Sequence, residues 1–195
     1  MQKIEIPAEK VNTKLPSAKE FYRETLINQR KVINEHIQKA IEDGKNEVKF
    51  LFETYATIDD EMQDLGWEYD TWSPEDDPDE EYTMYYVDSS STEFDFEDQT
   101  DATTNEENGK VRLITAKEFY NKTLERQKQI IRTQVLETKP TGRNEVLLRF
   151  ITYSCIDEEM RALGWEYGTW TPDDEPNVEY TMFYVEADDI DEEDY

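Results

Sequence analysis

The chain has 195 residues and a formal net charge of −27, from 48 Asp and Glu against 21 Lys and Arg. This charge repels nucleic acid and anionic membranes, so it argues against direct binding to either and favours a partner with a basic surface; solubility is the alternative explanation. The single cysteine excludes an internal disulfide, and no run approaches the roughly 18 apolar residues of a membrane span, so we expect a soluble, cytoplasmic protein.

A repeat at an offset of 98 residues indicates the domain organisation. AKEFY at 18–22 recurs at 116–120, and LGWEY at 65–69 recurs at 163–167. A period this long indicates two duplicated domains rather than a solenoid, whose units have roughly 20 to 50 residues. The sequence therefore predicts an N-terminal extension (1–16), a first module (17–87), an acidic linker (88–110), a second module (111–185) and an acidic C-terminal tail (186–195).

The first predicted element of each module is a long amphipathic helix. Apolar residues recur at three- and four-residue steps over 17–43. Ser17 with Glu20, and Thr115 with Glu118, match the capping box that begins many helices. The second helix should end about a turn earlier than the first, because a proline interrupts it.

A short strand should follow at 48–52, and at 146–150 in the second module, since both runs are apolar. A short helix over 58–65 comes next, followed by aromatic strands at 67–72 and 82–87. The sequence thus predicts an α+β fold of two tandem α-β-α-β-β modules. Each would be a three-stranded sheet covered on one face by a long and a short helix.

The aromatic residues of these strands are too numerous for one sheet face to bury. Successive residues of a strand point to opposite faces, so about half should be exposed. We expect four side chains of the first module to point inward: Trp67, Tyr69, Met84 and Tyr86. We expect Trp72 and Tyr85, with their second-module counterparts Trp170 and Phe183, to contact a partner or the other module.

Acidic residues dominate the later part of each module. Positions 50–109 contain no Lys or Arg, and after position 149 only Arg161 is basic. Charge of one sign costs self-repulsion, so this arrangement suggests a binding role. The predicted partner-binding set joins these acids with the outward aromatics: Asp70, Trp72, Glu75, Asp76, Asp77, Asp79, Glu80, Tyr85, Trp170, Asp173, Asp174, Glu175 and Phe183.

Metal binding and catalysis are not expected. The acidic turns at 74–81 and 172–179 lack the ligand spacing of a calcium loop, so we predict no metal and no cofactor. Asp59 and Glu61 could in principle act as an acid–base pair, but they open a short helix, where the dipole favours acids. The single histidine, His36, has no counterpart in the second module. We therefore expect a non-enzymatic binding protein.

The AKEFY opening, the long Lys- and Glu-bearing helix and the LGWEY segment resemble small acidic bacteriophage-encoded proteins of unassigned function. The resemblance implies one of two roles. The first is an inhibitor in the host cytoplasm that mimics DNA and occupies a basic surface of a host nucleic-acid-binding protein, with carboxylates in place of phosphates. The alternative is a capsid or tail component of the virion, in which two similar modules hold two sites.

Overall fold

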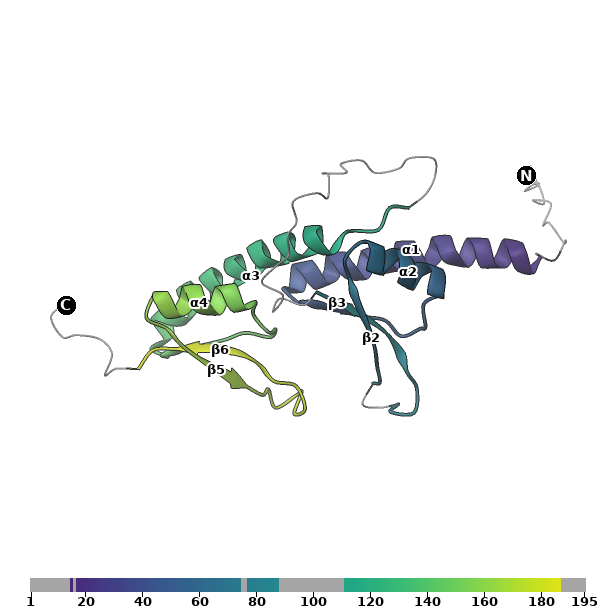
Figure 1. Ribbon diagram of the computed structural model, residues 1–195. Helices are drawn as coiled ribbons and strands as arrows, with labels where there is room; N and C mark the ends of the chain where they lie inside the picture. The colour runs from purple at the N-terminus through teal and green to yellow at the C-terminus, as the bar shows by residue number, and fades with distance from the viewer. Residues whose placement is uncertain (1–14, 16, 75–76, 88–110, 187–195) are drawn as a thin grey trace, which may run out of the picture.

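The computed structural model describes residue 15 and the ranges 17–74, 77–87 and 111–186 (Figure 1). This described part is an α+β structure with four α-helices and two three-stranded antiparallel sheets. The predicted linker lies outside the described residues, as do nearly all of the predicted N-terminal extension and C-terminal tail. No helix in the described ranges is long and apolar enough to cross a membrane.

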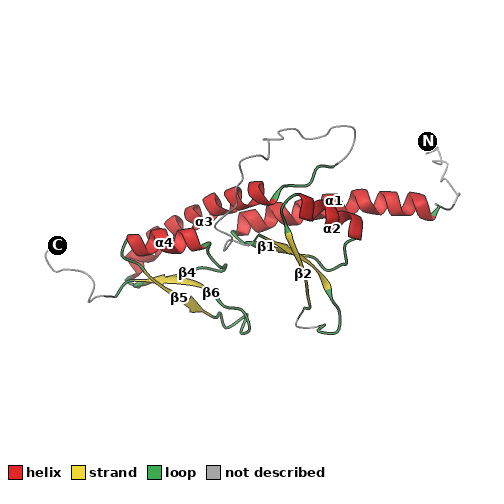
Figure 2. Cartoon of the chain, in the orientation of Figure 1, coloured by secondary structure: helices red, strands yellow, loops and turns green. Residues whose placement is uncertain are grey.

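In the first half of the chain, residues 17–87, the central strand of the sheet comes last in sequence. The elements are α1 (Ala18–Asp43), β1 (Glu47–Lys49), α2 (Ala56–Asp64), β2 (Glu68–Trp72) and β3 (Tyr82–Tyr86). β3 pairs antiparallel with both other strands, and the helices lie together on one side of the sheet (Figure 2). The predicted capping box forms, because Ser17 Oγ accepts from the Glu20 amide while the Glu20 carboxylate accepts from the Ser17 amide.

The second half, residues 111–186, repeats this order. Its elements are α3 (Ala116–Thr138), the 3-10 turn η1 (Lys139–Thr141), β4 (Glu145–Leu147), α4 (Ser154–Ala162), β5 (Glu166–Trp170) and β6 (Tyr180–Tyr184). The strand register is also the same, since Glu47 opposes Tyr86 in the first sheet and Glu145 opposes Tyr184 in the second. α3 ends just before Pro140, as predicted, because proline has no N–H to continue the helix.

The short first strands and the start of α3 differ from the sequence prediction. β1 and β4 begin one residue earlier than expected and have three residues each. The apolar run after β1 reflects burial in the core rather than a longer strand, since the Phe50 side chain is buried. At the start of α3, Thr115 caps the Glu118 amide, but the Glu118 carboxylate forms ion pairs with Arg112 and Lys122, so only half of that capping box forms.

The predicted faces of the central strands were wrong. Tyr85 and Phe183, expected outward, are 0 % exposed and point toward the helices. Met84 and Tyr86, expected inward, lie on the opposite sheet face and are half-buried. Alternation shows which residues share a face, but aromatic residues on both faces leave the choice of the buried face open.

The side chains form two hydrophobic cores, and the first is not built from the first half alone. Four residues at the beginning of the second half pack into it: Leu113, Ile114, Ala116 and Phe119. Trp67, buried as predicted, lies beside the Phe119 ring with the ring centroids 4.8 Å apart. The second core contains only residues of the second half, including Ile131, Phe150 and Phe183. The two halves are therefore joined by a packed interface.

Candidate functional site

The predicted acidic residues of the first half lie at the surface. Asp70 is exposed on β2, and Asp77, Asp79 and Glu80 are exposed in the loop between β2 and β3. In Figure 1 this loop and the β5–β6 loop project to the side away from α1 and α3. Two further residues of the predicted set, Glu75 and Asp76, lie outside the described residues. The structure thus brings exposed carboxylates together on a loop that extends from the sheet.

The two predicted tryptophans are half-buried at the edges of the sheets. The Trp72 indole N–H donates to the backbone oxygen of Phe50 at 3.0 Å, and the Trp170 indole N–H donates to that of Leu148 at 2.7 Å. Each indole therefore supplies a hydrogen bond to the backbone carbonyl of the residue that follows β1 or β4. This role stabilises the sheet and leaves part of each ring exposed.

The acidic loop of the second half is partly neutralised. Asp173 and Asp174 are exposed and Glu175 is half-buried, but Arg149 donates to both Asp174 carboxylate oxygens, at 2.8 and 3.0 Å. These hydrogen bonds hold the pKa of Asp174 below its usual value. Sequence reasoning missed this pairing because Arg149 stands just before the segment of nearly pure acid.

Glu175 also accepts a hydrogen bond from the Tyr180 hydroxyl at 2.9 Å. Burial, together with this bond, raises the pKa of Tyr180 to about 12. The second loop is therefore held to β6 and to the chain just after β4 by hydrogen bonds to its carboxylates. Among the described loop residues, the carboxylates of Asp77, Asp79 and Glu80 are thus less compensated than those of the second loop.

Asp59 has a structural role that sequence reasoning did not identify. Its carboxylate accepts hydrogen bonds from the Thr54 hydroxyl and from the Tyr85 hydroxyl, the latter at 2.5 Å. At the corresponding position of the second half, Asp157 accepts from Thr152, but Phe183 replaces the tyrosine. Burial raises the pKa of Asp157 above its usual value. Asp59 thereby connects α2 to β3, and Asp157 connects α4 to β6 through Thr152, whose hydroxyl also meets that of Thr181.

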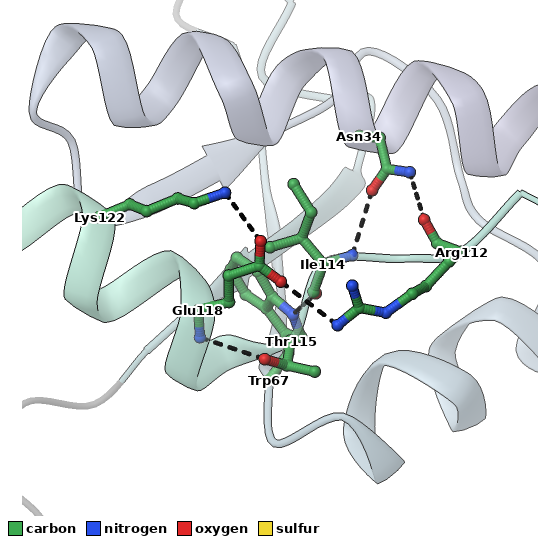
Figure 3. A network of polar contacts seen from close by, with 7 residues as sticks. All are labelled: Asn34, Trp67, Arg112, Ile114, Thr115, Glu118 and Lys122. Carbon is green, nitrogen blue, oxygen red and sulfur yellow. Dashed lines mark hydrogen bonds and ion pairs between the residues drawn. The ribbon is translucent and has the colours of Figure 1, made fainter. Parts of the chain in front are cut away.

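The joint between the halves carries a network of polar contacts, shown in Figure 3. The Trp67 indole N–H donates to the Ile114 oxygen at 2.8 Å. The Asn34 side chain donates to the Arg112 oxygen at 2.6 Å and accepts from the Ile114 amide at 3.2 Å, which fixes the chain before α3 to α1. The Ala116 amide donates to the Leu65 oxygen at 3.0 Å.

A second group of contacts lies farther along α3. The Gln127 side chain donates to the Gly44 oxygen at 2.6 Å, and Arg126 donates to the Glu42 oxygen at 2.9 Å. Both acceptors are carbonyls at the end of α1, which lack partners within their own helix. α3 therefore caps α1, and the joint combines apolar burial with satisfied backbone groups.

A cleft of about 330 Å³ lies beside this joint. Its first-half wall includes Lys39, Lys45 and Lys49, and its second-half wall includes Ile151 and Glu179. The charges around the cleft are mixed, so it does not select ligands of one sign.

Within the described residues, no group of three or more His, Cys, Asp or Glu side chains is arranged to hold a metal ion. No protein-family model matches the chain, and neither curated proteins nor solved structures provide a match. The candidate sites are therefore defined by geometry and charge alone: the exposed acidic loops and the joint between the halves.

Proposed function

We propose that this chain is a non-enzymatic binding protein whose acidic loops and adjoining sheet edges occupy a basic surface of a nucleic-acid-binding protein. The loops would take the place of a phosphate backbone, as a DNA-mimic inhibitor does. The supporting observation is the exposure of Asp77, Asp79 and Glu80 on a loop that projects away from α1 and α3.

The distribution of positive charge supports the same proposal. α1 and α3 carry exposed basic side chains, among them Lys19, Arg23, Lys31, Arg126 and Arg132. The side with the acidic loops thus differs in charge from the side with the long helices. A surface of one sign raises the association rate with an oppositely charged partner, and this effect weakens as salt is added.

Partner capture from the native host at low and high salt would test this function. We expect a basic nucleic-acid-binding protein to be retained at low salt and lost at high salt. A matched pair of variants locates the surface. The loop variant carries Asp77→Asn, Asp79→Asn and Glu80→Gln, and the control carries Glu24→Gln, Glu35→Gln and Glu42→Gln on α1.

Both variants remove three negative charges from exposed positions. The loop variant should slow association by about tenfold or more at low salt, whereas the control should change it far less. Equal effects of the two variants would show that only net charge matters and would contradict a site on the loop.

A second candidate is a structural component that holds two similar sites. We propose that the two halves arose by duplication of one module, which is supported by the sequence repeat and by the equal strand registers. The packed joint between the halves favours a building block over two independently moving binders. Co-purification with capsid or tail proteins in fixed stoichiometry, unaffected by salt, would support this candidate.

A further inference from the structure

The second half has an open groove at the place where the first half is filled. A groove of about 410 Å³ is lined by Ile131, Val135, Met160, Leu163 and Trp165. Residues 98 positions earlier form the first-half surface that receives the beginning of the second half: Ile33, Ile37, Met62, Leu65 and Trp67. In the second half, Leu163 is 68 % exposed and Trp165 is only half-buried.

The glycines of the two halves also differ in how closely other residues surround them. A methyl group added at Gly44 would meet Ile130 and Phe150 at 3.2 Å, and one at Gly66 would meet Ala116 at 3.4 Å. At the corresponding Gly142 and Gly164, nothing described lies within 4 Å. The surface that the second half covers on the first is therefore present, but uncovered, on the second half itself.

The complementary side chains are exposed at the other end of the molecule. Phe119, which fills the first groove, is 0 % exposed, whereas Phe21, 98 positions earlier, is 60 % exposed. Leu15 is 86 % exposed, and its counterpart Leu113 is 1 % exposed. The beginning of α1 extends past the first sheet, as Figure 1 shows. Leu15 and Phe21 are thus exposed, whereas the corresponding side chains of the second half are buried in the joint.

Two sequence changes at the corresponding positions remove one hydrogen-bond donor and one acceptor of the joint. In the joint, the Ile114 amide donates to the Asn34 side chain. Proline stands at the position of Ile114 in the first half, Pro16, and has no N–H to donate. Arg132 stands at the position of Asn34 in the second half and has no acceptor atom. The lost donor and the lost acceptor would therefore meet each other.

We propose that the chain associates head to tail with a second copy of itself, with the segment 15–21 of one copy occupying the groove beside Leu163 and Trp165 of the other. The contact would reproduce the internal joint: the Trp165 indole N–H would donate to a backbone oxygen of the segment, and the Ala18 amide to the Leu163 oxygen. Such a contact joins two different surfaces, so it produces rings or open filaments.

A second copy is the appropriate occupant because one chain cannot fill its own groove. The beginning of α1 and helix α4 lie at opposite ends of the molecule in Figure 1, and α4 supplies Met160 to the lining of the groove. The internal joint also shows that surfaces built from the corresponding residues, 98 positions away in each case, pack against each other. The proposal rests on this joint and does not depend on the function of the acidic loops.

Salt distinguishes this association from binding through the acidic loops. Copies that each carry a net charge of −27 repel one another. Added salt screens this repulsion, so self-association through an apolar contact should strengthen. Binding of the acidic loops to a basic partner should weaken under the same conditions. Either proposal can therefore fail without the other.

Sedimentation velocity of the full chain over a range of concentrations tests the proposal. We expect oligomers whose size grows with concentration and with salt. Phe21→Asp in the segment and Leu163→Asp in the groove should each lower the association constant at least about tenfold, as expected for central apolar anchors. Leu51→Asp is the matched control, because Leu51 is 69 % exposed and lies outside both surfaces.

Mixing the two defective variants gives the decisive result. The F21D chain keeps its groove and the L163D chain keeps its segment, so the mixture should form a complex of one copy of each and nothing larger. Circular dichroism checks that both variants fold. A wild-type chain that stays monomeric at hundreds of micromolar and high salt, association that survives in both variants, or failure of the folded variants to pair would overturn the proposal.

Discussion

The rings of Trp67 and Phe119 lie 4.8 Å apart between centroids at an interplanar angle of 41°, although they belong to different halves of the chain. Both side chains are almost fully buried. The first core is therefore completed by a residue of α3, and the stability of the first half depends on the second.

Phe119→Ala should lower the free energy of unfolding by about 3 to 5 kcal/mol, since it leaves a cavity in a closed core. The matched variant, Phe21→Ala, should change it by less than about 0.5 kcal/mol in dilute monomer, because Phe21 is exposed there. Urea unfolding followed by tryptophan fluorescence measures both. Similar losses for the two variants would contradict the asymmetry between the halves.

The two helix-end glycines provide an independent test of the joint. Gly44 and Gly142 both have positive φ, at 74° and 76°, so alanine is strained at either position. At Gly44 the added methyl must also displace Ile130 and Phe150. Gly44→Ala should therefore cost about 1 to 3 kcal/mol more than Gly142→Ala in thermal or urea unfolding. Equal costs would mean that the joint adapts freely.

The elements themselves could be predicted from local sequence. The capping box of Ser17 and Glu20, the helical spacing of apolar residues and the aromatic strands all depend on neighbouring residues, and they formed close to their expected positions. The buried face of β3 could not be predicted in this way. Tyr85 is buried by packing against residues distant in sequence, among them Phe50 and Trp67, and Phe183 is equally buried at the corresponding position without a hydroxyl.

The candidate site, too, could be predicted only where it depends on local sequence. Exposure of Asp77, Asp79 and Glu80 follows from their position in a polar turn. The joint depends on long-range packing of residues just after the acidic linker. A signal was present there, since Leu113 and Ile114 are apolar residues directly before a helix cap, but the division into two modules obscured it.

Tyr85 gives a prediction at alkaline pH. Its burial and its hydrogen bond to Asp59 raise its pKa above the usual value. The folded state thus holds this proton more tightly than the unfolded chain, so the associated stability is complete below about pH 10 and is lost as pH rises further. Tyr85→Phe should cost about 1.5 to 3 kcal/mol at neutral pH, because it removes a hydrogen bond to a carboxylate.

Tyr85→Phe should also make the decline of stability above pH 10 less steep than in the wild type. Urea unfolding of both proteins at several pH values measures this difference. A constant difference between the two proteins across the alkaline range would contradict a linked titration of Tyr85.

Arg149 should control the titration of Asp174. Arg149→Leu, which introduces the residue found at the corresponding position 51, removes both hydrogen bonds to the carboxylate. The pKa of Asp174 should then rise to the usual range of an exposed aspartate. Carboxyl-detected NMR titration measures it, with Asp173 as the internal control. If the pKa of Asp174 stays low in the variant, the loop backbone rather than Arg149 causes the shift.

The raised pKa of Asp157 can be tested at position 183, where phenylalanine replaces the tyrosine whose hydroxyl donates to Asp59 in the first half. Burial raises the pKa of Asp157, so the folded protein binds this proton more tightly than the unfolded chain. The stability linked to the proton is therefore complete below about pH 4 and is lost as pH rises through the folded pKa. Phe183→Tyr would place a donor where Tyr85 places one on Asp59.

A donated hydrogen bond favours the charged carboxylate, so Phe183→Tyr should lower the pKa of Asp157 toward its usual value. The loss of stability between pH 4 and neutrality that belongs to Asp157 should shrink accordingly. NMR titration gives the pKa, and Asp157→Asn defines the response without the titrating group. An unchanged Asp157 pKa in a folded Phe183→Tyr protein would show that a hydroxyl at position 183 of β6 does not reach the Asp157 carboxylate.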